Sequence, residues 1–424
     1  MHDFRVLRDQ VEVLRGGMQR RGKLEAYAAL IDRGVALDLE RRTMIQAVEE
    51  RKAARNQNSQ EVARRKKNRE DADELIAAGR ALGEEIARLE GELATSEAAL
   101  QDILLELPNV PLDEVPAGDE SHNAIVKTWG TPRDSAGCKP HWDLAAALGI
   151  LDLERGAKIS GSGFVVMRGM GARLTRALMN FFIDVHVRDH GYEEVWVPVV
   201  VNRQTMIGTG QLPKFEEDMY GIRGEELYLV PTAEVPVTNL YRDEILDGAS
   251  LPRGFVAYTP CFRREAGSAG KDTRGLLRLH QFDKVEMVRY STPEQSPDEH
   301  EKMTRHAEEL LERLGLPYRR VLLAGGDTGQ SSAKTWDLEA WAPGVGKWLE
   351  VSSCSTFTEY QARRANIRYR PAPGEKPRFV HTLNGSGLAF PRVIACLLEQ
   401  YQQADGAVVV PEVLRPYLGT DLLK

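Results

Sequence analysis

The sequence has few of the features that would place it outside the cell or in a membrane. Its 424 residues include four cysteines, Cys138, Cys261, Cys354 and Cys396. They are spread singly along the chain, which excludes a zinc knuckle or a disulfide framework. No basic segment followed by an apolar stretch opens the sequence, and no apolar run reaches membrane-spanning length. We therefore expect a cytoplasmic protein with no membrane association.

An excess of positive charge is also missing. Lys and Arg total 56 against 63 Asp and Glu, which gives a net charge of −7. Binding to nucleic acid through overall charge is therefore excluded, and such a partner would have to meet local basic patches. Hydrophobic residues make up 42% of the chain and charged residues 28%, so the chain is not broadly disordered. Its length predicts two or three folded units.

Several common nucleotide-binding and catalytic motifs are absent from the sequence. None of the Gly-Lys pairs precedes Ser or Thr, so there is no phosphate-binding P-loop. Neither Gly-x-Gly-x-x-Gly nor the Gly-x-Ser-x-Gly nucleophile elbow occurs. The nine histidines show no metal-ligand spacing of the His-Glu-x-x-His kind. Hydride transfer, P-loop phosphoryl transfer and serine hydrolysis are all disfavoured.

Proline is absent from Leu37 to Ile103, where strong helix formers dominate. The second half of this stretch has an apolar seam with coiled-coil spacing. Its members are Leu75, Leu82, Ile86, Leu89, Leu93, Leu100 and Ile103. A polar break at Arg64–Asp71 precedes the seam. The pattern predicts two long antiparallel helices joined at a basic tip, each of about 30 residues and ~45 Å.

The charge of this helical arm is uneven. Residues 38–70 carry ten Lys or Arg against six acids, whereas residues 71–106 carry ten acids and two Arg. One interpretation is a hairpin in which each helix neutralises the other through salt bridges. The other is a nucleic-acid probe whose first helix and tip face a phosphate backbone. Charge by itself leaves both open.

Leu107–Pro111 ends the arm and marks the clearest domain boundary. We expect an N-terminal domain over residues 1–106, a linker over 107–120 and a second domain over 121–424. In the second domain, strand-like runs follow one another instead of alternating with helices, which favours an α+β fold with a mainly antiparallel sheet flanked by helices. The expected strands are 194–198, 227–230, 255–263, 281–290, 318–323 and 347–352, and the expected helices are 173–190, 299–314 and 392–402.

Three segments of this domain carry polar groups that could bind a ligand or a metal ion. Phe262–Glu265 ends an apolar strand and precedes the Gly/Ser-rich loop Ala266–Gly275, which suits a polyanionic ligand or an ordinary surface hairpin. Glu350–Ser353 offers the hard oxygen ligands that magnesium prefers, or a polar edge strand. Asn384–Arg392 precedes an apolar helix, and its glycines would let backbone approach a ligand or simply form a turn.

In this order, the three segments resemble the motifs of class II aminoacyl-tRNA synthetases, and within that class the seryl enzymes. The segment ending at Pro198 resembles motif 1, Phe262–Phe282 resembles motif 2, and Gly385–Arg392 resembles motif 3. Further seryl-type segments are 208–215, 231–234, 274–282, 350–355, 361–364 and 411–417. The resemblance covers the whole chain, arm included. Two departures from the family pattern are Arg264 and the Phe390-Pro391 pair.

The resemblance implies a class II catalytic domain preceded by a coiled-coil arm, and serine–tRNA ligase activity (EC 6.1.1.11) with ATP and Mg²⁺. It implies that Arg263, Glu350 and Arg392 are catalytic, and that Glu350 and Ser353 hold the metal. It also implies that ATP contacts a set of ten residues: Arg263, Arg264, Glu265, Leu279, Phe282, Glu350, Val351, Ser352, Ser353 and Arg392. No zinc is implied.

The same resemblance implies the amino-acid substrate and the macromolecular partners. L-serine would be bound by Thr232, Ala233, Glu234, Arg263, Glu286 and Ser386, with the first three near its ammonium and the last two near its hydroxyl. The expected macromolecular partners are tRNA(Ser), tRNA(Sec) and a second copy of the chain in a homodimer. Two alternatives come from other classes. One is a synthetase-like ligase that loads a small amino acid onto a carrier protein, and the other is a non-catalytic coiled-coil interaction protein.

Overall fold

The computed structural model describes residues 1–266 and 274–424, and the chain forms two compact units. One unit consists of residues 2–19 and 23–107, and the other of residue 1, residues 20–22 and residues 108–424. Among the described residues, no helix has both the length and the apolar character that crossing a bilayer requires.

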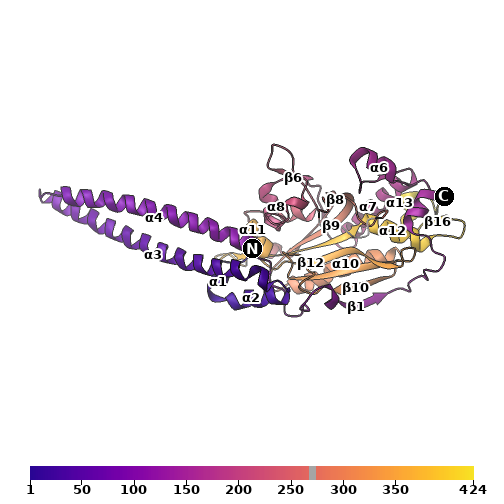
Figure 1. Cartoon of the computed structure of the whole chain (residues 1–424), viewed down its shortest axis with the longest axis horizontal. Coiled ribbons are helices and arrows are strands. Elements are labelled where there is room, and N and C mark those ends of the chain that lie inside the picture. The colour runs from indigo at the N-terminus through magenta and orange to yellow at the C-terminus, as the bar shows by residue number, and fades with distance from the viewer. Residues whose placement is uncertain (267–273) are drawn as a thin grey trace. The chain divides into compact units, whose positions relative to one another are not determined.

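The first unit is helical and contains the predicted hairpin. Its helices are α1 (Arg5–Asp9), α2 (Val11–Arg20), α3 (Leu24–Lys67) and α4 (Asp73–Glu106), with α3 and α4 antiparallel and side by side (Figure 1). The 44 residues of α3 span ~66 Å, so the helix is longer than expected and begins well before Leu37. It runs through Gly34, where an added Cβ would lie 3.0 Å from a methyl group of Leu7.

Ion pairs join the two long helices along their shaft. Arg41 pairs with Glu97 at 2.9 Å, and Lys52 pairs with Glu90 at 3.0 Å. The salt-bridged interpretation therefore holds for the shaft. The tip differs, because Lys66, Lys67 and Arg69 are exposed there and form no ion pair with any described residue.

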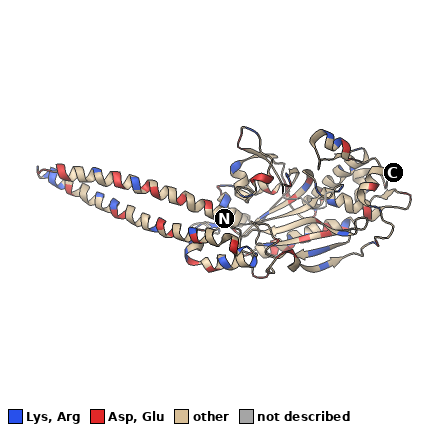
Figure 2. Cartoon of the chain, viewed as in Figure 1, with Lys and Arg blue, Asp and Glu red and all other residues tan. Residues whose placement is uncertain are grey.

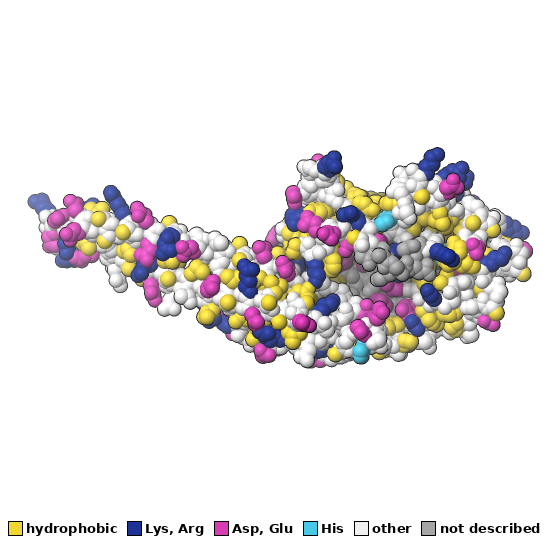
Figure 3. Space-filling model, viewed as in Figure 1, with side chains coloured by type: hydrophobic (Ala, Val, Ile, Leu, Met, Phe, Trp, Pro, Cys, Tyr) yellow, Lys and Arg dark blue, Asp and Glu magenta, His cyan; other side chains and the backbone are white. Residues whose placement is uncertain are grey.

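Both charge types alternate along the shaft, while Lys and Arg gather at the tip (Figure 2). The Lys and Arg side chains of the tip lie on the surface of the molecule (Figure 3). The tip therefore presents three neighbouring cations that no acidic side chain of the hairpin neutralises.

The second unit is built on one large sheet with the order β1-β10-β11-β12-β15-β9-β8-β4 in the described residues. The strands are β1 (Ala124–Trp129), β4 (Glu193–Glu194), β8 (Arg253–Phe262), β9 (Gln281–Ser291), β10 (Tyr318–Leu322), β11 (Lys334–Ala342), β12 (Lys347–Thr356) and β15 (His381–Ala389). Neighbours are antiparallel except β4 and β8, which are parallel. The predicted antiparallel α+β fold is confirmed.

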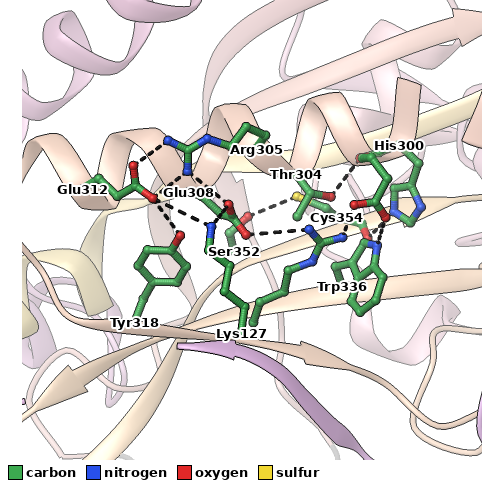
Figure 4. A network of polar contacts seen from close by, with 12 residues as sticks. Lys127, His300, Thr304, Arg305, Glu308, Glu312, Tyr318, Trp336, Ser352 and Cys354 are labelled. Atoms are coloured by element: carbon green, nitrogen blue, oxygen red, sulfur yellow. Dashed lines mark hydrogen bonds and ion pairs between the residues drawn. The ribbon is translucent and has the colours of Figure 1, made fainter. Parts of the chain in front are cut away.

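Three helices pack against this sheet and against one another: α7 (Met170–Arg188), α10 (Ser296–Arg313) and α12 (Phe390–Tyr401). A polar cluster also ties α10 to the sheet (Figure 4). Its centre is the buried carboxylate of Glu308, which lies 2.6 Å from Lys127 of β1 and 3.1 Å from Arg305. Because the charge is paired on more than one side, its burial is compensated.

Shorter elements surround this framework. The helices are α5 (His141–Ala147), α6 (Leu153–Ser160), α8 (Arg203–Thr209), α9 (Glu234–Thr238), α11 (Tyr360–Ala365) and α13 (Arg415–Leu418), with η1 (Glu120–His122), η2 (Glu216–Asp218), η3 (Gly248–Ser250) and η4 (Glu412–Leu414). The short strands are β2 (Leu151–Asp152), β3 (Val166–Met167), β5 (Val200–Asn202), β6 (Leu227–Leu229), β7 (Ile245–Asp247), β13 (Arg368–Arg370), β14 (Arg378–Phe379), β16 (Val408–Val409) and β17 (Leu422–Leu423).

The strand predicted over 194–198 is wrong beyond Glu194. The ladder stops there, and Trp196 projects into solvent with 77% of its surface exposed. Pro198, which has no N–H to donate, makes a longer strand unfavourable. In contrast, the segment interpreted as a turn before Arg392 forms β15, because β9 and β12 pair with it on either side.

Candidate active site

A cavity of about 490 Å³ lies in the second unit and gathers side chains from distant parts of the chain. Strand β9 contributes Phe282, Lys284 and Glu286, while β12 contributes Glu350, Val351, Ser353 and Ser355, and β15 contributes Asn384 and Ser386. Arg263, directly after β8, and Arg392, in the first turn of α12, complete this wall. The strand ends that carry the three predicted segments therefore meet at one place.

The two predicted catalytic arginines are held by backbone carbonyl groups. The Nε of Arg263 donates to the Pro231 oxygen at 3.3 Å, and its guanidinium lies 5.2 Å from the centre of the Phe282 ring. Arg392 donates to the carbonyl oxygens of Leu277 and Glu350 at 3.2 and 2.9 Å. Guanidinium groups fixed in this way keep further N–H donors for a phosphate.

The predicted metal ligands lie next to Arg392. The Glu350 carboxylate is 3.3 Å from the Arg392 guanidinium, and Ser353 lines the same cavity. Asp337 of β11 pairs in register with Ser353, accepts a hydrogen bond from its side chain and keeps one buried oxygen without a partner. Burial, and then the charge of Glu350, raise the pKa of Asp337. This set of hard oxygens fits magnesium, which usually takes few protein ligands and completes its shell with water and phosphate.

The residues predicted to hold the adenine end also line the cavity. Leu279 and Phe282 form apolar lining, and Glu265 lines the cavity while forming an ion pair with Arg278. The loop that was expected to contact phosphates, Ala266–Gly275, lies largely outside the described residues, since residues 267–273 are not described.

The predicted serine ligands form a buried polar cluster. The Lys284 ammonium forms an ion pair with Glu286 and donates to the Thr232 hydroxyl at 2.8 Å. Thr232 in turn lies 3.3 Å from a Glu286 oxygen. Glu234 accepts from the Gln361 amide at 2.6 Å, and burial followed by the charge of Glu286 raises its pKa from 4.5 to about 7. The cluster can therefore bind an ammonium and a hydroxyl group together.

Three predicted contact residues lie outside the described lining of this cavity: Arg264, Ala233 and Ser352. Ala233 is fully buried at the start of α9, and Arg264 is held through its backbone N–H by Asp218. Ser352 is buried behind the cavity, where its hydroxyl donates to the Ser386 carbonyl at 2.7 Å. Side chains alternate along a strand, so the side chain of Ser352 points away from the face that carries Ser353.

The glycines of Gly385-Ser386-Gly387 have a packing role. A Cβ at Gly385 would lie 2.6 Å from the sulfur of Cys354, and a Cβ at Gly387 would lie 2.3 Å from Nε2 of His186. Side chains therefore occupy the space beside both glycines. Close packing at the Cβ positions accounts for glycine at both places, and the approach of their backbone to a ligand stays a prediction.

The second departure from the family pattern has a structural explanation. Phe390 is buried and packs edge-on against Phe182 of α7, with ring centres 5.6 Å apart. Pro391 stands in the first turn of α12, where proline is favoured, and lines the cavity beside Arg392. Both residues therefore suit the positions they occupy.

Sequence reasoning missed Lys284 and Asp337 of this region, and it placed Gln361 in a seryl-type segment without giving it a role. Lys284 stands two positions before the predicted Glu286 on β9, and this alternation was a usable signal. Asp337 comes from β11, and no local pattern connects it to the cavity, whereas Gln361 of α11 belongs to the seryl-type segment 361–364.

Family comparisons agree with this geometry. Residues 1–111 match the model of the seryl-tRNA synthetase N-terminal domain, and residues 214–401 match the class II core domain of the Gly, His, Pro, Ser and Thr synthetases. The serine–tRNA ligase of Gemmatimonas aurantiaca is 64% identical over the full length of both chains. The chain belongs to the seryl-tRNA synthetase family.

Other members of the family also align over nearly the full length of this chain, at lower sequence identity. The serine–tRNA ligase of Geobacillus kaustophilus is 54% identical over 99% of both chains. The crystal structure of the Pyrococcus horikoshii seryl-tRNA synthetase complexed with ATP covers 100% of this chain and 99% of its own, with a TM-score of 0.95 at 40% identity. A Naegleria fowleri serine–tRNA ligase in complex with AMP gives a TM-score of 0.89 at 30% identity. The predicted family and class of enzyme are confirmed.

Proposed function

We propose that this seryl-tRNA synthetase activates L-serine with ATP and transfers the seryl group to tRNA, with the cavity described above as its active site. In the first step a serine carboxylate oxygen attacks the α-phosphorus of ATP, the bond to the β-phosphate breaks and pyrophosphate leaves. In the second, a hydroxyl of the 3′-terminal ribose attacks the carbonyl carbon and AMP leaves. The observation that carries the proposal is that Arg263, Glu350, Arg392 and the serine cluster line one cavity.

The protein's part in the first step is positioning and charge neutralisation. Arg263 binds the α-phosphate, where negative charge builds as the new bond forms, and also contacts the serine carboxylate. Arg392 binds the γ-phosphate. The carbonyl contacts that fix both guanidinium groups support these roles, because donors held in place before ATP arrives need little reorganisation during the reaction.

The adenine end lies against Phe282 and Leu279, with Glu265 contacting its polar edge. The Phe282 ring faces a cation, the guanidinium of Arg263. An aromatic face at this position can accept a purine by stacking. Val351 adds apolar lining beside it.

Mg²⁺, when bound, neutralises phosphate charge and draws the phosphates into a fixed arrangement. Glu350 and Ser353 would hold it, and Asp337 would orient Ser353 through their hydrogen bond. The ion pair between Glu350 and Arg392 keeps both side chains near the phosphate end of the cavity before ATP enters.

Serine is recognised by its ammonium and its hydroxyl group. Glu234 and Thr232 accept from the ammonium, and Glu286 and Ser386 bond the hydroxyl. A pocket of this kind can reject alanine by ~10⁴-fold, because the groups that meet the hydroxyl would lose their partner. Threonine is excluded by its additional methyl group, so no editing domain is needed.

The helical unit binds tRNA(Ser), and by the same recognition tRNA(Sec), through their long variable arms. The exposed Lys66, Lys67 and Arg69 at its tip support this, because phosphate binding needs cations that acidic neighbours have not neutralised. A carrier-protein ligase would not need such a tip, and a non-catalytic coiled-coil protein would not need the cavity.

The active form is a symmetric homodimer. Strand β4 stands at the edge of the large sheet, and Trp196 beside it is 77% exposed. An open strand edge next to a large exposed aromatic side chain is typical of a surface that a second copy covers.

Amino-acid-dependent ATP–pyrophosphate exchange tests the proposed function. Serine should drive exchange, whereas alanine, glycine and threonine should not, and tRNA should accept the activated serine. Arg263→Ala should lower the exchange rate by ~10²–10³-fold, since a positioned charge donor would be lost. Arg253→Ala, at the other end of β8, is the matched control and should keep the rate. Equal exchange with alanine would exclude the proposed recognition of the hydroxyl.

A further inference from the structure

A buried histidine of α7 touches the strand that carries Ser386. His186 is fully buried, and its Nε2 lies 3.2 Å from the carbonyl oxygen of Gly387, the residue after Ser386. Neither the predicted motifs nor the proposed chemistry uses this side chain. We propose that His186 is a positioning residue for the serine pocket, which holds Ser386 in place through the Gly387 carbonyl. The inference rests on the proposed function of the cavity.

The strand needs such support because its ladder breaks at this point. Ser386 pairs in register with Glu286, but the next pair along β15 is Ala389 with Lys284. Gly387 and Leu388 therefore lie opposite no ladder partner on β9. A buried carbonyl that loses its ladder bond needs another donor, and His186 supplies one.

A second donor acts on the neighbouring carbonyl. The hydroxyl of Ser352 donates to the Ser386 carbonyl at 2.7 Å. Figure 4 shows Ser352 on β12 next to Cys354, whose sulfur lies 3.6 Å from its hydroxyl. Ser386 is thus held at its own carbonyl by β12 and at the next one by α7, while its side chain faces the cavity.

The proton positions on the imidazole follow from its partners. A carbonyl oxygen only accepts, so Nε2 of His186 must carry the proton. The Nδ1 of His186 lies 2.9 Å from Nδ1 of His190, and a neutral His186 accepts a hydrogen bond there from the Nδ1–H tautomer of His190. Burial lowers the pKa of His186 well below its ordinary value, which favours this neutral form. The ring is therefore fixed at both nitrogens.

The geometry explains why loss of the His186 hydrogen bond should weaken serine binding more than ATP binding. Ser386 lies opposite Glu286, and both belong to the cluster that meets the serine hydroxyl. The ATP ligands Arg263 and Glu350 stand on other strands or beyond their ends, and Arg392, in the helix after β15, is held separately by the carbonyls of Leu277 and Glu350. Loss of the His186 bond would let the Gly387 region shift and would disturb serine binding more than ATP binding.

Three variants of the full-length protein test this inference by pyrophosphate exchange: His186→Leu, His186→Gln and His306→Leu. His186→Leu should raise the KM for serine by ~10-fold and leave the KM for ATP nearly unchanged, since a buried acceptor is left unpaired. His186→Gln should restore much of the loss, because its amide can donate to the same carbonyl. His306→Leu is the matched control: His306 stacks on His190 at 4.0 Å and should keep the KM for serine.

Thermal unfolding of each variant separates a folding defect from a positioning defect. If His186→Leu does not fold, Ser352→Ala replaces it and should also raise the KM for serine. An unchanged KM for serine in the folded variant, equal rises for serine and ATP, or no rescue by Gln would each overturn the inference. If the unaltered protein shows no serine-dependent exchange, the proposed function itself fails, which is a distinguishable result.

Discussion

The raised pKa of Glu234 predicts that serine binding depends on pH near neutrality. The carboxyl lines the cavity, and burial followed by the charge of Glu286 raises its pKa from 4.5 to about 7. Near pH 7, therefore, about half of the empty pockets carry a protonated Glu234. The serine ammonium binds the ionised form, so a protonated pocket must first release its proton.

The size of the effect follows from the titration. At pH 6, one unit below the pKa of about 7, roughly nine carboxyls in ten are protonated, and at pH 8 roughly one in ten is. The apparent KM for serine should therefore be about tenfold higher at pH 6 than at pH 8. The KM for ATP should not follow this curve. Pyrophosphate exchange across this range, with serine varied at saturating ATP and ATP varied at saturating serine, gives both constants.

Two variants make the test specific. Glu234→Gln removes the titrating group, so it should raise the KM for serine at pH 8 and abolish the pH dependence. Gln361→Met removes the amide that donates to Glu234 at 2.6 Å and so favours the neutral carboxyl, which should move the midpoint to higher pH. A KM for serine that is flat from pH 6 to 8, or an equal slope in Glu234→Gln, would refute the reasoning.

Four further predictions concern other parts of the molecule. Replacing residues 50–88 with a short Gly/Ser turn should keep serine-dependent pyrophosphate exchange but abolish tRNA charging. Full charging by the shortened protein would contradict the role of the arm. Neutralising the tip should flatten the log–log salt dependence of tRNA binding by roughly one unit per lost phosphate contact, whereas Arg51→Ala, whose side chain pairs with Glu85, should change it less. Light scattering should give twice the 47.4 kDa chain mass, and Trp196→Glu should give a monomer. Burial lowers the pKa of His300 to about 4, so between pH 6.5 and 4 only the unfolded chain binds that proton. His300 should therefore contribute a fall of about 1.4 kcal/mol per pH unit to the free energy of unfolding as pH drops through this window, and His300→Gln should reduce the total slope in urea titrations by that amount.

Much of the local structure can be predicted from the residues alone. The seam from Leu75 to Ile103 and the absence of proline predict the helical hairpin, because helix periodicity is a local property. The predicted strands over 255–263 and 281–290 match β8 and β9 closely, since apolar β-branched and aromatic runs favour strands wherever they pack. The motifs and their order also identify the family, which the full-length relatives confirm.

Tertiary structure decides which of these local elements meet. Nothing in the sequence near Ser386 indicates that His186 and Ser352, from a helix and a strand far along the chain, donate to its strand. The partner of Ser353, Asp337, comes from a strand with no motif of its own, and the segment that holds Gln361 does not by itself indicate that Gln361 meets Glu234. The sequence by itself therefore determines the helical hairpin, the long helices α7, α10 and α12 and several strands of the large sheet. The charge state of Glu234 and the support of Ser386 depend on burial and strand pairing, because both arise from contacts between segments that are distant in the chain.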